Sequence, residues 1–408
     1  ADRTFHPLQQ VAGKPMSIRT VYLCDGIRTP FGRYKGGLSG VRTDDLAALP
    51  LAFLADRYPR IAEAIDEIIL GCANQSGEDN RNVARMAGLL AGLPVSVPAY
   101  TVNRLCASGL EASGQGARAI ALGGADLILA GGVESMSRAP YVMAKAQDGF
   151  ERGQQLEDTT LGWRMINPRM CAMYGVDSMA QTAENLAGQF GISREDQDAF
   201  AYRSQRRAAQ AIADGVLDAD IMPVNGLDHD EQPRADTTLE KLAGLKPITG
   251  DDGSITAGNA SSLNDGSCAL LLASPKALQQ YGLTPRARIT GMASAGVAPR
   301  VMGLGPVPAI EKLLVRQRRT MAHIDRLEVN EAFAAQVLGV SRALGLADTD
   351  DMLNRHGGAL AFGHPLGASG ARLVLQVMHE ISRKESRSAI VSLCVGVGQG
   401  VAMGIEAI

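Results

Sequence analysis

The feature that most constrains the fold of this chain is an internal repeat. The run IDEIILGCANQ begins at Ile65 and the run IDRLEVNEAFAAQ begins at Ile324, an offset of 259 residues (324 − 65). The tripeptide Ala-Ser-Gly that starts at Ala107 returns at Ala368, an offset of 261 (368 − 107). In each copy a helix-like run and then an apolar strand-like run follow. These three landmarks occur in the same order and at nearly the same spacing in both copies, which indicates a duplicated unit. The alternative is that any two strand–helix units look alike, and the shared spacing argues against it.

The alternation of strand-like and helix-like runs in both copies predicts an α/β fold with sheets buried on both faces. Between the copies, the stretch from 138 to 262 is polar and turn-rich, which predicts an inserted domain that carries ligand contacts. We therefore expect an N-terminal half made of 16–137 plus 263–284, and a C-terminal half made of 285–408. Residues 1–15 lack the pattern of either half and are interpreted as an extension or a cloning remnant.

Composition excludes several classes of protein. The formal charge of −3 and the scattered Lys and Arg argue against a nucleic-acid partner. No apolar run approaches the roughly 20 residues that span a bilayer, and 1–15 lacks the apolar core of a secretory signal. The six cysteines lie far apart without the spacing of a zinc site, so we expect no metal. A reduced, cytoplasmic protein without a membrane partner is the simplest interpretation.

Cys106 is the first candidate for chemistry. It lies in VNRLCASGL (102–110), between an extended-looking run and a small-residue helix that contains Gly114 and Gly116. Those glycines would each cost about 1 kcal/mol in an exposed helix, so they predict a buried, closely packed one. A cysteine at the helix N-terminus is expected to have a lowered pKa and to act as a nucleophile. Because free cysteine is among the most buried residue types, an inert core cysteine is an equal alternative at this point.

Two further stretches carry candidates. His364 lies in a Gly-His-Pro turn, where a histidine can take a proton from a thiol; a structural histidine is the alternative, and His356 is interpreted as structural. Cys394 follows an apolar strand and precedes three alternating glycines whose N–H groups could face a ligand oxygen. The same glycines allow a dinucleotide-binding interpretation, which is weak because no βαβ unit follows. Asn330 and the loop 256–266 are, by themselves, typical turn formers.

Taken together, NRLCASG, NEAF, GHPLGASG and CVGVGQG, in this order, resemble the thiolase family from about Met16 to Ile408. The resemblance implies a duplicated, five-layered αβαβα sandwich with an inserted loop domain. It implies Cys106 as the acylated nucleophile, His364 as its base and Cys394 as the acid/base at the substrate's α-carbon. Asn330 would hold a water in an oxyanion hole shared with His364. The backbone N–H groups of Cys106 and Gly396 would form a second hole.

The resemblance also implies a substrate class. The runs CANQSGEDNRNVARM, GGVESMSRAPYVM and DTTLGWRMINP look like the 3-oxoadipyl-CoA thiolases of aromatic-compound catabolism. Two departures from common patterns are Ser262 after GNAS and Ser178 before Met179; the second argues against a simple acetoacetyl-CoA role. Coenzyme A would be a co-substrate rather than a permanent cofactor, and the assembly a homodimer or homotetramer. The implied contacts with coenzyme A are Met179, Arg234, Lys241, Ala257, Ser261, Met302 and Phe333.

The alternatives are a broad-range acetyl-CoA acetyltransferase acting on acetoacetyl-CoA or fatty acyl substrates, and a catalytically inactive acyl-CoA-binding relative. A condensing synthase is disfavoured because such relatives lack a Cys394-type acid/base. A dicarboxylic substrate further requires a partner for its free carboxylate, and arginine suits it best. The candidates are Arg81, Arg85, Arg138 and Arg164. We favour Arg138 or Arg164 because they flank the inserted segment, although a structural role is the commoner one for each taken singly.

Overall fold

The two halves of the chain repeat one strand topology. The computed structural model describes residues 18–408, so the predicted extension at 1–15 lies outside the described residues. In the N-terminal half the strand order is β4-β3-β5-β8-β1, which in chain order is third, second, fourth, fifth, first. The C-terminal half has the order β10-β11-β12-β9, and a parallel bridge from Leu327 to Leu353 supplies the missing third position beside β10. This shared order confirms the duplication that the sequence predicts.

The strands have the following bounds. Those of the N-terminal half are β1 (Val21–Arg28), β2 (Gly32–Arg33), β3 (Glu67–Gly71), β4 (Ala99–Val102), β5 (Leu127–Ser135) and β8 (Asn264–Ala273). Those of the C-terminal half are β9 (Ala287–Gly296), β10 (Arg326–Val329), β11 (Ser388–Val395) and β12 (Gln399–Glu406). Antiparallel pairing of β1 with β9 joins both sets into one ten-stranded mixed sheet.

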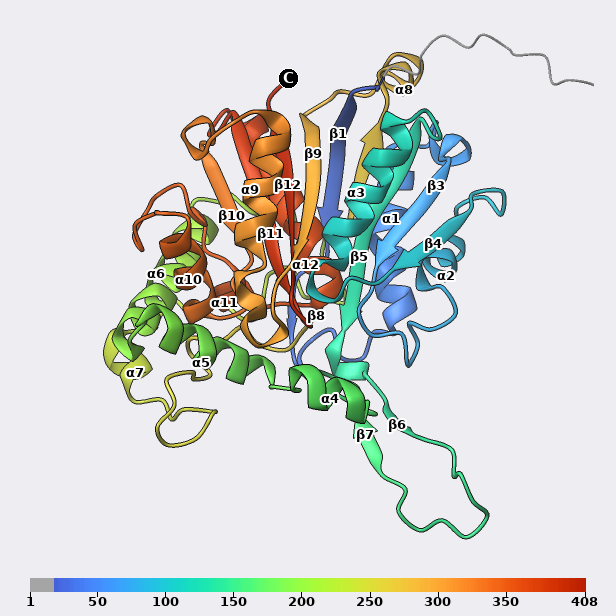
Figure 1. The fold of residues 1–408 in the computed structure, drawn as a ribbon. Coiled ribbons are helices and arrows are strands. Elements are labelled where there is room, and N and C mark those ends of the chain that lie inside the picture. Colours follow the sequence, from blue (N-terminus) through green and yellow to red (C-terminus); the bar gives the residue numbers. More distant parts are fainter. Residues whose placement is uncertain (1–17) are drawn as a thin grey trace, which may run out of the picture.

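The two halves of this sheet face a shared central helix layer, and each half carries an outer helix layer on its other face, so the predicted αβαβα order is confirmed. The N-terminal half (blue to teal in Figure 1) carries its own outer helices, and the C-terminal half (orange to red) carries others, while α3 and α12 lie between the halves. The outer helices are α1 (Thr43–Arg57), α2 (Val83–Leu90), α9 (Pro306–Gln317) and α10 (Ala334–Ala343), and the central pair is α3 (Ser108–Ala121) and α12 (Leu366–Ser382). Of two short helices, α8 (Pro275–Tyr281) follows β8 directly and α11 (Ala359–Phe362) packs against α6.

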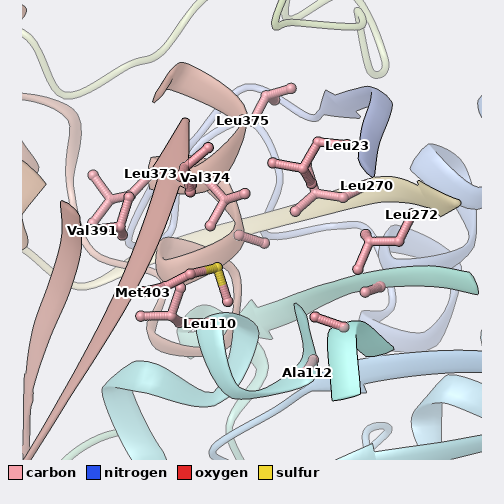
Figure 2. Packing of buried hydrophobic residues seen from close by; sticks show 14 of the residues in the cluster. Leu23, Leu110, Ala112, Leu270, Leu272, Leu373, Val374, Leu375, Val391 and Met403 are labelled. Atoms are coloured by element: carbon pink, nitrogen blue, oxygen red, sulfur yellow. The ribbon is translucent and has the colours of Figure 1, made fainter. Parts of the chain in front are cut away.

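The central layer is the apolar core that joins the halves. Figure 2 shows Leu110 and Ala112 of α3, and Leu373 of α12, packed among side chains of β1, β8, β11 and β12. The residues of α12 from 367 to 381 are all buried, so this helix has no solvent-facing side. A Cβ on Gly114 would overlap Met292, and one on Gly116 would lie 3.1 Å from Ile128. The prediction that these glycines belong to a closely packed helix is therefore confirmed.

The stretch between β5 and β8 lies at one end of the halves. It begins with a hairpin that projects away from the sheets, followed by helices that cross beneath them (Figure 1). Ser178 caps α5 and Ser193 caps α6 through their side-chain oxygens, which explains where these helices begin. We propose that this stretch is the inserted domain expected at 138–262. Its elements are β6 (Tyr141–Met143), β7 (Leu156–Asp158), α4 (Pro168–Tyr174), α5 (Met179–Phe190), α6 (Arg194–Ala213) and α7 (Leu239–Ala243).

Within residues 18–408 no helix is long and apolar enough to cross a membrane. All six cysteines are free.

Candidate active site

Cys106 lies in the 3₁₀ turn η2 (Leu105–Ala107), between β4 and α3. The turn is strained, because Leu105 has a φ of +46°, which is unusual for a branched side chain. Two side chains hold it: Asn103 Oδ1 accepts from the Leu105 N–H at 2.9 Å, and Ser108 Oγ donates to the Leu105 carbonyl at 2.6 Å. A strained backbone that is fixed by neighbouring hydrogen bonds is typical of functional sites. In this turn it fixes the direction of the Cys106 side chain.

The Cys106 thiol is not the lowered-pKa thiolate that the sequence predicts. Burial raises its pKa to about 11, although the backbone N–H groups of Gly396 and of Cys106 itself lower it. The prediction was wrong because Cys106 precedes the first turn of α3, where the apolar surroundings outweigh the helix dipole. The residue as a whole is partly exposed and lines the two cavities described below, so a substrate can reach it. Its attack on a substrate therefore requires a base to take the proton.

His364 lies in the turn that leads into α12, and this turn is held from β8. Gly363 has a φ of +92°, and a Cβ there would overlap the amide of Asn264. Asn264 Oδ1 accepts from the His364 backbone N–H at 3.0 Å and from Ser262 Oγ at 2.7 Å, while its Nδ2 donates to the Gly32 carbonyl at 2.9 Å. Only glycine allows both the left-handed conformation and the contact with Asn264.

The hydrogen bonds of the His364 ring assign its tautomer. Ser369 Oγ donates to the Pro365 carbonyl at 3.1 Å, so it accepts from Nδ1–H of His364 at 2.6 Å. The Nε2 atom then carries the lone pair and accepts from Asn330 Nδ2 at 3.3 Å. Burial lowers the pKa of His364 to about 4, so the ring is neutral at physiological pH. A neutral imidazole with Nε2 free of a proton is suited to act as a base.

Cys394 lies near the end of β11, opposite Gly400 of β12. The connecting turn contains Gly396, then Val397 at φ +63° and Gly398 at φ +84°. This arrangement is a β-hairpin, so the dinucleotide-binding interpretation of the glycine run is wrong. Cys394 is fully buried, and both its burial and the nearby Cys106 raise its pKa, so it is held as a protonated thiol.

One cavity of about 70 Å³ brings the predicted catalytic side chains together: Cys106, His364 and Cys394 all line it. Of the predicted coenzyme A contacts, Met179, Ser261, Met302 and Phe333 line it as well. The others lie outside: Arg234 and Ala257 are exposed on the surface, and Lys241 Nζ pairs with Asp236 at 2.6 Å. Their role toward coenzyme A stays a prediction.

A larger cavity of about 350 Å³ also reaches Cys106 and extends beneath the loop between β7 and α4. Gly396 and Met179 contribute to its floor, and Leu161, Trp163 and Arg164 contribute to its wall. The indole of Trp163 is oriented by a hydrogen bond to the Asp177 carbonyl at 3.2 Å. Cys106 lines both cavities, which also share Leu161, Met179 and Leu366.

Three further residues position the site and were not among the residues predicted from the sequence. Asn264 holds the His364 turn and Ser369 sets the histidine tautomer. Glu134 is buried beneath the Cys106 loop, where its carboxylate accepts from the backbone N–H groups of Ala73, Asn74 and Gly367. Burial raises the pKa of Glu134 to about 7 against the lowering effect of those hydrogen bonds. Asn264 and Glu134 act on residues far away along the chain, so no local motif marks them, whereas Ser369 lies inside the run GHPLGASG, five residues after His364.

The described residues contain one cluster with metal-ligand chemistry. Potential ligand atoms of Cys72, Asp79 and Glu134 lie within 4.8 Å of one another. Each is already engaged: the Cys72 thiol donates to the Asn74 carbonyl, Asp79 accepts from the Gly77 N–H, and Glu134 accepts the three N–H groups named above. We therefore assign no metal to this cluster.

Comparisons with known proteins agree with this geometry. Residues 21–276 match the thiolase N-terminal domain and residues 283–407 match the thiolase C-terminal domain. A curated beta-ketoadipyl-CoA thiolase of Pseudomonas knackmussii is 58% identical over 397 residues, which is 95% of this chain and 99% of that protein. The 3-oxoadipyl-CoA/3-oxo-5,6-dehydrosuberyl-CoA thiolase of Escherichia coli K12 is 57% identical, covering 95% of this chain and all of that protein.

A solved structure is similar over nearly the same extent. Human mitochondrial 3-ketoacyl-CoA thiolase in complex with CoA is 38% identical, with a TM-score of 0.89 over 96% of this chain and 98% of that one. Both family domains together span almost all of the described residues, and the relatives match from end to end. This chain belongs to the thiolase family.

Proposed function

We propose that the protein cleaves 3-oxoadipyl-CoA with coenzyme A to give succinyl-CoA and acetyl-CoA, in aromatic-compound catabolism. The observation that carries the thiolase chemistry is the meeting of two thiols and a neutral histidine, Cys106, Cys394 and His364, around one cavity. The choice of substrate is supported by the end-to-end identity with relatives named for this activity. Coenzyme A acts as the second substrate, as it does throughout the family.

The first half of the reaction breaks a carbon–carbon bond. Nε2 of His364 takes the proton of Cys106 while the sulfur attacks the C3 ketone of the substrate. The bond between C2 and C3 then breaks, which leaves a succinyl thioester on Cys106 and the enolate of acetyl-CoA. The Cys394 thiol gives its proton to that enolate and releases acetyl-CoA.

The second half returns the acyl group to coenzyme A. The Cys394 thiolate takes the thiol proton of coenzyme A, whose sulfur attacks the succinyl thioester. Cys106 leaves as a thiolate, regains its proton from His364, and succinyl-CoA is released. Two N–H groups, those of Cys106 and Gly396, are directed toward the Cys106 sulfur and suit an oxyanion that forms beside it. Removing one donor of such a pair typically lowers the rate about 10²- to 10³-fold. A water held by Asn330, together with His364 once its Nε2 carries the Cys106 proton, would supply the hydrogen bonds for the thioester oxygen of the substrate.

Coenzyme A would enter past Met179, Phe333 and Met302, with its nucleotide end toward Arg234, Lys241 and Ala257. We further propose a homodimer or homotetramer as the working assembly. Neither proposal is needed for the chemistry above.

A steady-state assay with a panel of 3-oxoacyl-CoA substrates tests the proposed function. We expect the highest kcat/KM for 3-oxoadipyl-CoA, with succinyl-CoA and acetyl-CoA as products. A higher kcat/KM for acetoacetyl-CoA or for unbranched 3-oxoacyl chains would replace this proposal with a broad-range thiolase. Binding of acyl-CoA without any turnover would indicate an inactive relative.

The Cys394→Ala variant separates the two thiols. Because the variant keeps the nucleophile but loses the donor for the enolate, 3-oxoadipyl-CoA cleavage should stop while slow acylation of Cys106 by succinyl-CoA continues. Cleavage at the wild-type rate would contradict the role given to Cys394.

A further inference from the structure

We propose that Arg164 binds the free carboxylate of the acyl chain and so selects dicarboxylic substrates. This inference rests on the proposed function and names the residue that would give it its specificity. Arg164 lies in the loop between β7 and α4, and it lines the 350 Å³ cavity into which Cys106 opens. An acyl group bound to Cys106 and extending into that cavity points its far end at the wall that contains Arg164.

The charges around this cavity single out Arg164. It is the one cationic side chain among the residues that line the cavity in the described part of the chain, and no acidic side chain lines it. Within residues 18–408 Arg164 forms no salt bridge, and its hydrogen bond to the Gly162 carbonyl is long, at 3.4 Å. A guanidinium with free donors above a mostly apolar cavity is suited to receive a carboxylate.

Other polar groups of the cavity already have partners. Asn74 Nδ2 donates to the carbonyl and the hydroxyl oxygen of Thr159, both at 3.1 Å. The Thr159 hydroxyl donates to the Pro140 carbonyl at 2.6 Å. A carboxylate that enters the cavity therefore finds its strongest available donors on Arg164.

The structure also removes the other three arginines from consideration. Arg138 is bound to Glu78, with its Nε donating at 2.7 Å, so its charge is already neutralised. Arg85 donates to the backbone carbonyls of Val95 and Val97. Arg81 is exposed and does not line the cavity. Arg138, which the sequence favoured as strongly as Arg164, serves instead to tie the end of β5 to the loop that follows β3.

A pair of substrates that differ only at the far end tests this inference. 3-Oxoadipyl-CoA and 3-oxohexanoyl-CoA have the same number of acyl carbons, but the first ends in a carboxylate and the second in a methyl group. The ratio of their kcat/KM values reports recognition of the carboxylate alone, because losses of stability or of chemistry affect both substrates. The ratio is measured for the wild type, Arg164→Met, Arg164→Lys and Arg169→Met.

Arg164→Met should lower the ratio about 10- to 100-fold, since a desolvated carboxylate loses its partner. Arg164→Lys should lower it less, because the charge remains while the two-pronged geometry is lost. Arg169→Met is the matched control: Arg169 is exposed on α4, five residues away and outside the cavity, so the ratio should stay at the wild-type value.

The outcomes separate this inference from the proposed function. A wild type that prefers 3-oxoadipyl-CoA together with an unchanged ratio in Arg164→Met overturns the role of Arg164 and leaves the proposed function standing. A wild type without that preference overturns both. A fall in the ratio for Arg169→Met equal to that for Arg164→Met would indicate a general effect of surface charge and would also overturn the specific role.

Discussion

At the scale of single residues, the site combines a protonated thiol with a neutral imidazole. The pKa of Cys106 is raised to about 11 and that of His364 is lowered to about 4, and burial is the main cause of both. Near neutral pH the pair is therefore a thiol and an imidazole rather than a thiolate and an imidazolium. In the proposed mechanism the proton of Cys106 moves to His364 as the sulfur attacks the substrate.

The Cys106→Ser variant should lose turnover by about 10³-fold or more, because a serine hydroxyl is far less ionised and less nucleophilic than a thiol. Its thermal unfolding midpoint and its affinity for coenzyme A should stay close to the wild-type values. Mass spectrometry of the wild type after incubation with substrate should find an acyl adduct on the peptide that contains Cys106. An adduct found only on the peptide with Cys394 would reverse the roles of the two thiols.

His364 gives a prediction for pH. If its folded pKa is about 4, the base form persists well below the ordinary value near 6.5, so kcat/KM should show no acid limb that belongs to His364 between pH 5 and 7. Between pH 6.5 and 4 the unfolded chain binds a proton that the folded one does not. The contribution of His364 to the free energy of unfolding is therefore present above pH 6.5 and is lost as the pH falls toward 4.

The comparison of wild type with His364→Asn in urea unfolding at pH 7.5 and pH 5 checks this sign. The wild type should lose more stability on acidification than the variant does. An equal loss in both proteins would mean that the imidazole titrates near its ordinary value.

Residues that line the candidate site could be found from the sequence where they lie in a motif, and not where a distant contact places them. Cys106, His364 and Cys394 each lie in a distinctive run of glycines and small residues. Asn264 looks like an ordinary turn former in the sequence. Its role comes from the hydrogen bond that it accepts from the His364 backbone N–H, 100 residues further along the chain. The pKa of Cys106 was mispredicted because burial by side chains from other elements cannot be seen in the nine residues around it.

At the scale of elements, the position of His364 depends on the first residue of strand β8. β8 begins at Asn264, whose amide bonds the His364 backbone on one side and Gly32 on the other. The helix α12 begins only two residues after His364, so this amide also sets where the central helix starts. The prediction of a helix-like run after the Gly-His-Pro turn is confirmed, but its anchoring could not be read from the sequence.

The Asn264→Ala variant should lower kcat/KM about 10- to 100-fold. Without the Asn264 amide the turn that carries His364 can shift, and even a small shift moves the base away from the Cys106 thiol. Acylation of Cys106 by succinyl-CoA, followed by mass spectrometry, should slow by a similar factor. If the thermal midpoint falls while the acylation rate stays at the wild-type value, Asn264 supports the fold without positioning His364.

At the scale of the whole molecule, the duplication places the two reactive loops opposite each other. The Cys106 turn precedes α3 of the first half, and the His364 turn precedes α12 of the second, at equivalent places of the repeat. The site forms because these two helices cross closely, which is possible only with glycine at the crossing: a Cβ on Gly109 would overlap the Gly367 carbonyl, and one on Gly370 would overlap the Leu110 backbone. The sequence predicted the repeat from its spacing, whereas the closeness of the crossing emerges only in three dimensions.

The Gly109→Ala variant tests whether this crossing sets the geometry of the site. The added methyl group has backbone on its far side, so α3 and α12 must separate, at a cost of about 1–3 kcal/mol of stability. The separation moves Cys106 relative to His364, so kcat should fall as well as the thermal midpoint.

Gly188→Ala is the matched control, because Gly188 lies in the exposed part of α5 with no atom within 4 Å of the new methyl group. At this position the gain in helix propensity, about 1 kcal/mol, should raise the thermal midpoint slightly and leave kcat unchanged. If Gly109→Ala lowers the thermal midpoint but not kcat, the Cys106 and His364 turns keep their separation when the helices move apart. Their placement is then controlled by β8 and by the hairpin of β11 and β12 rather than by the central helices.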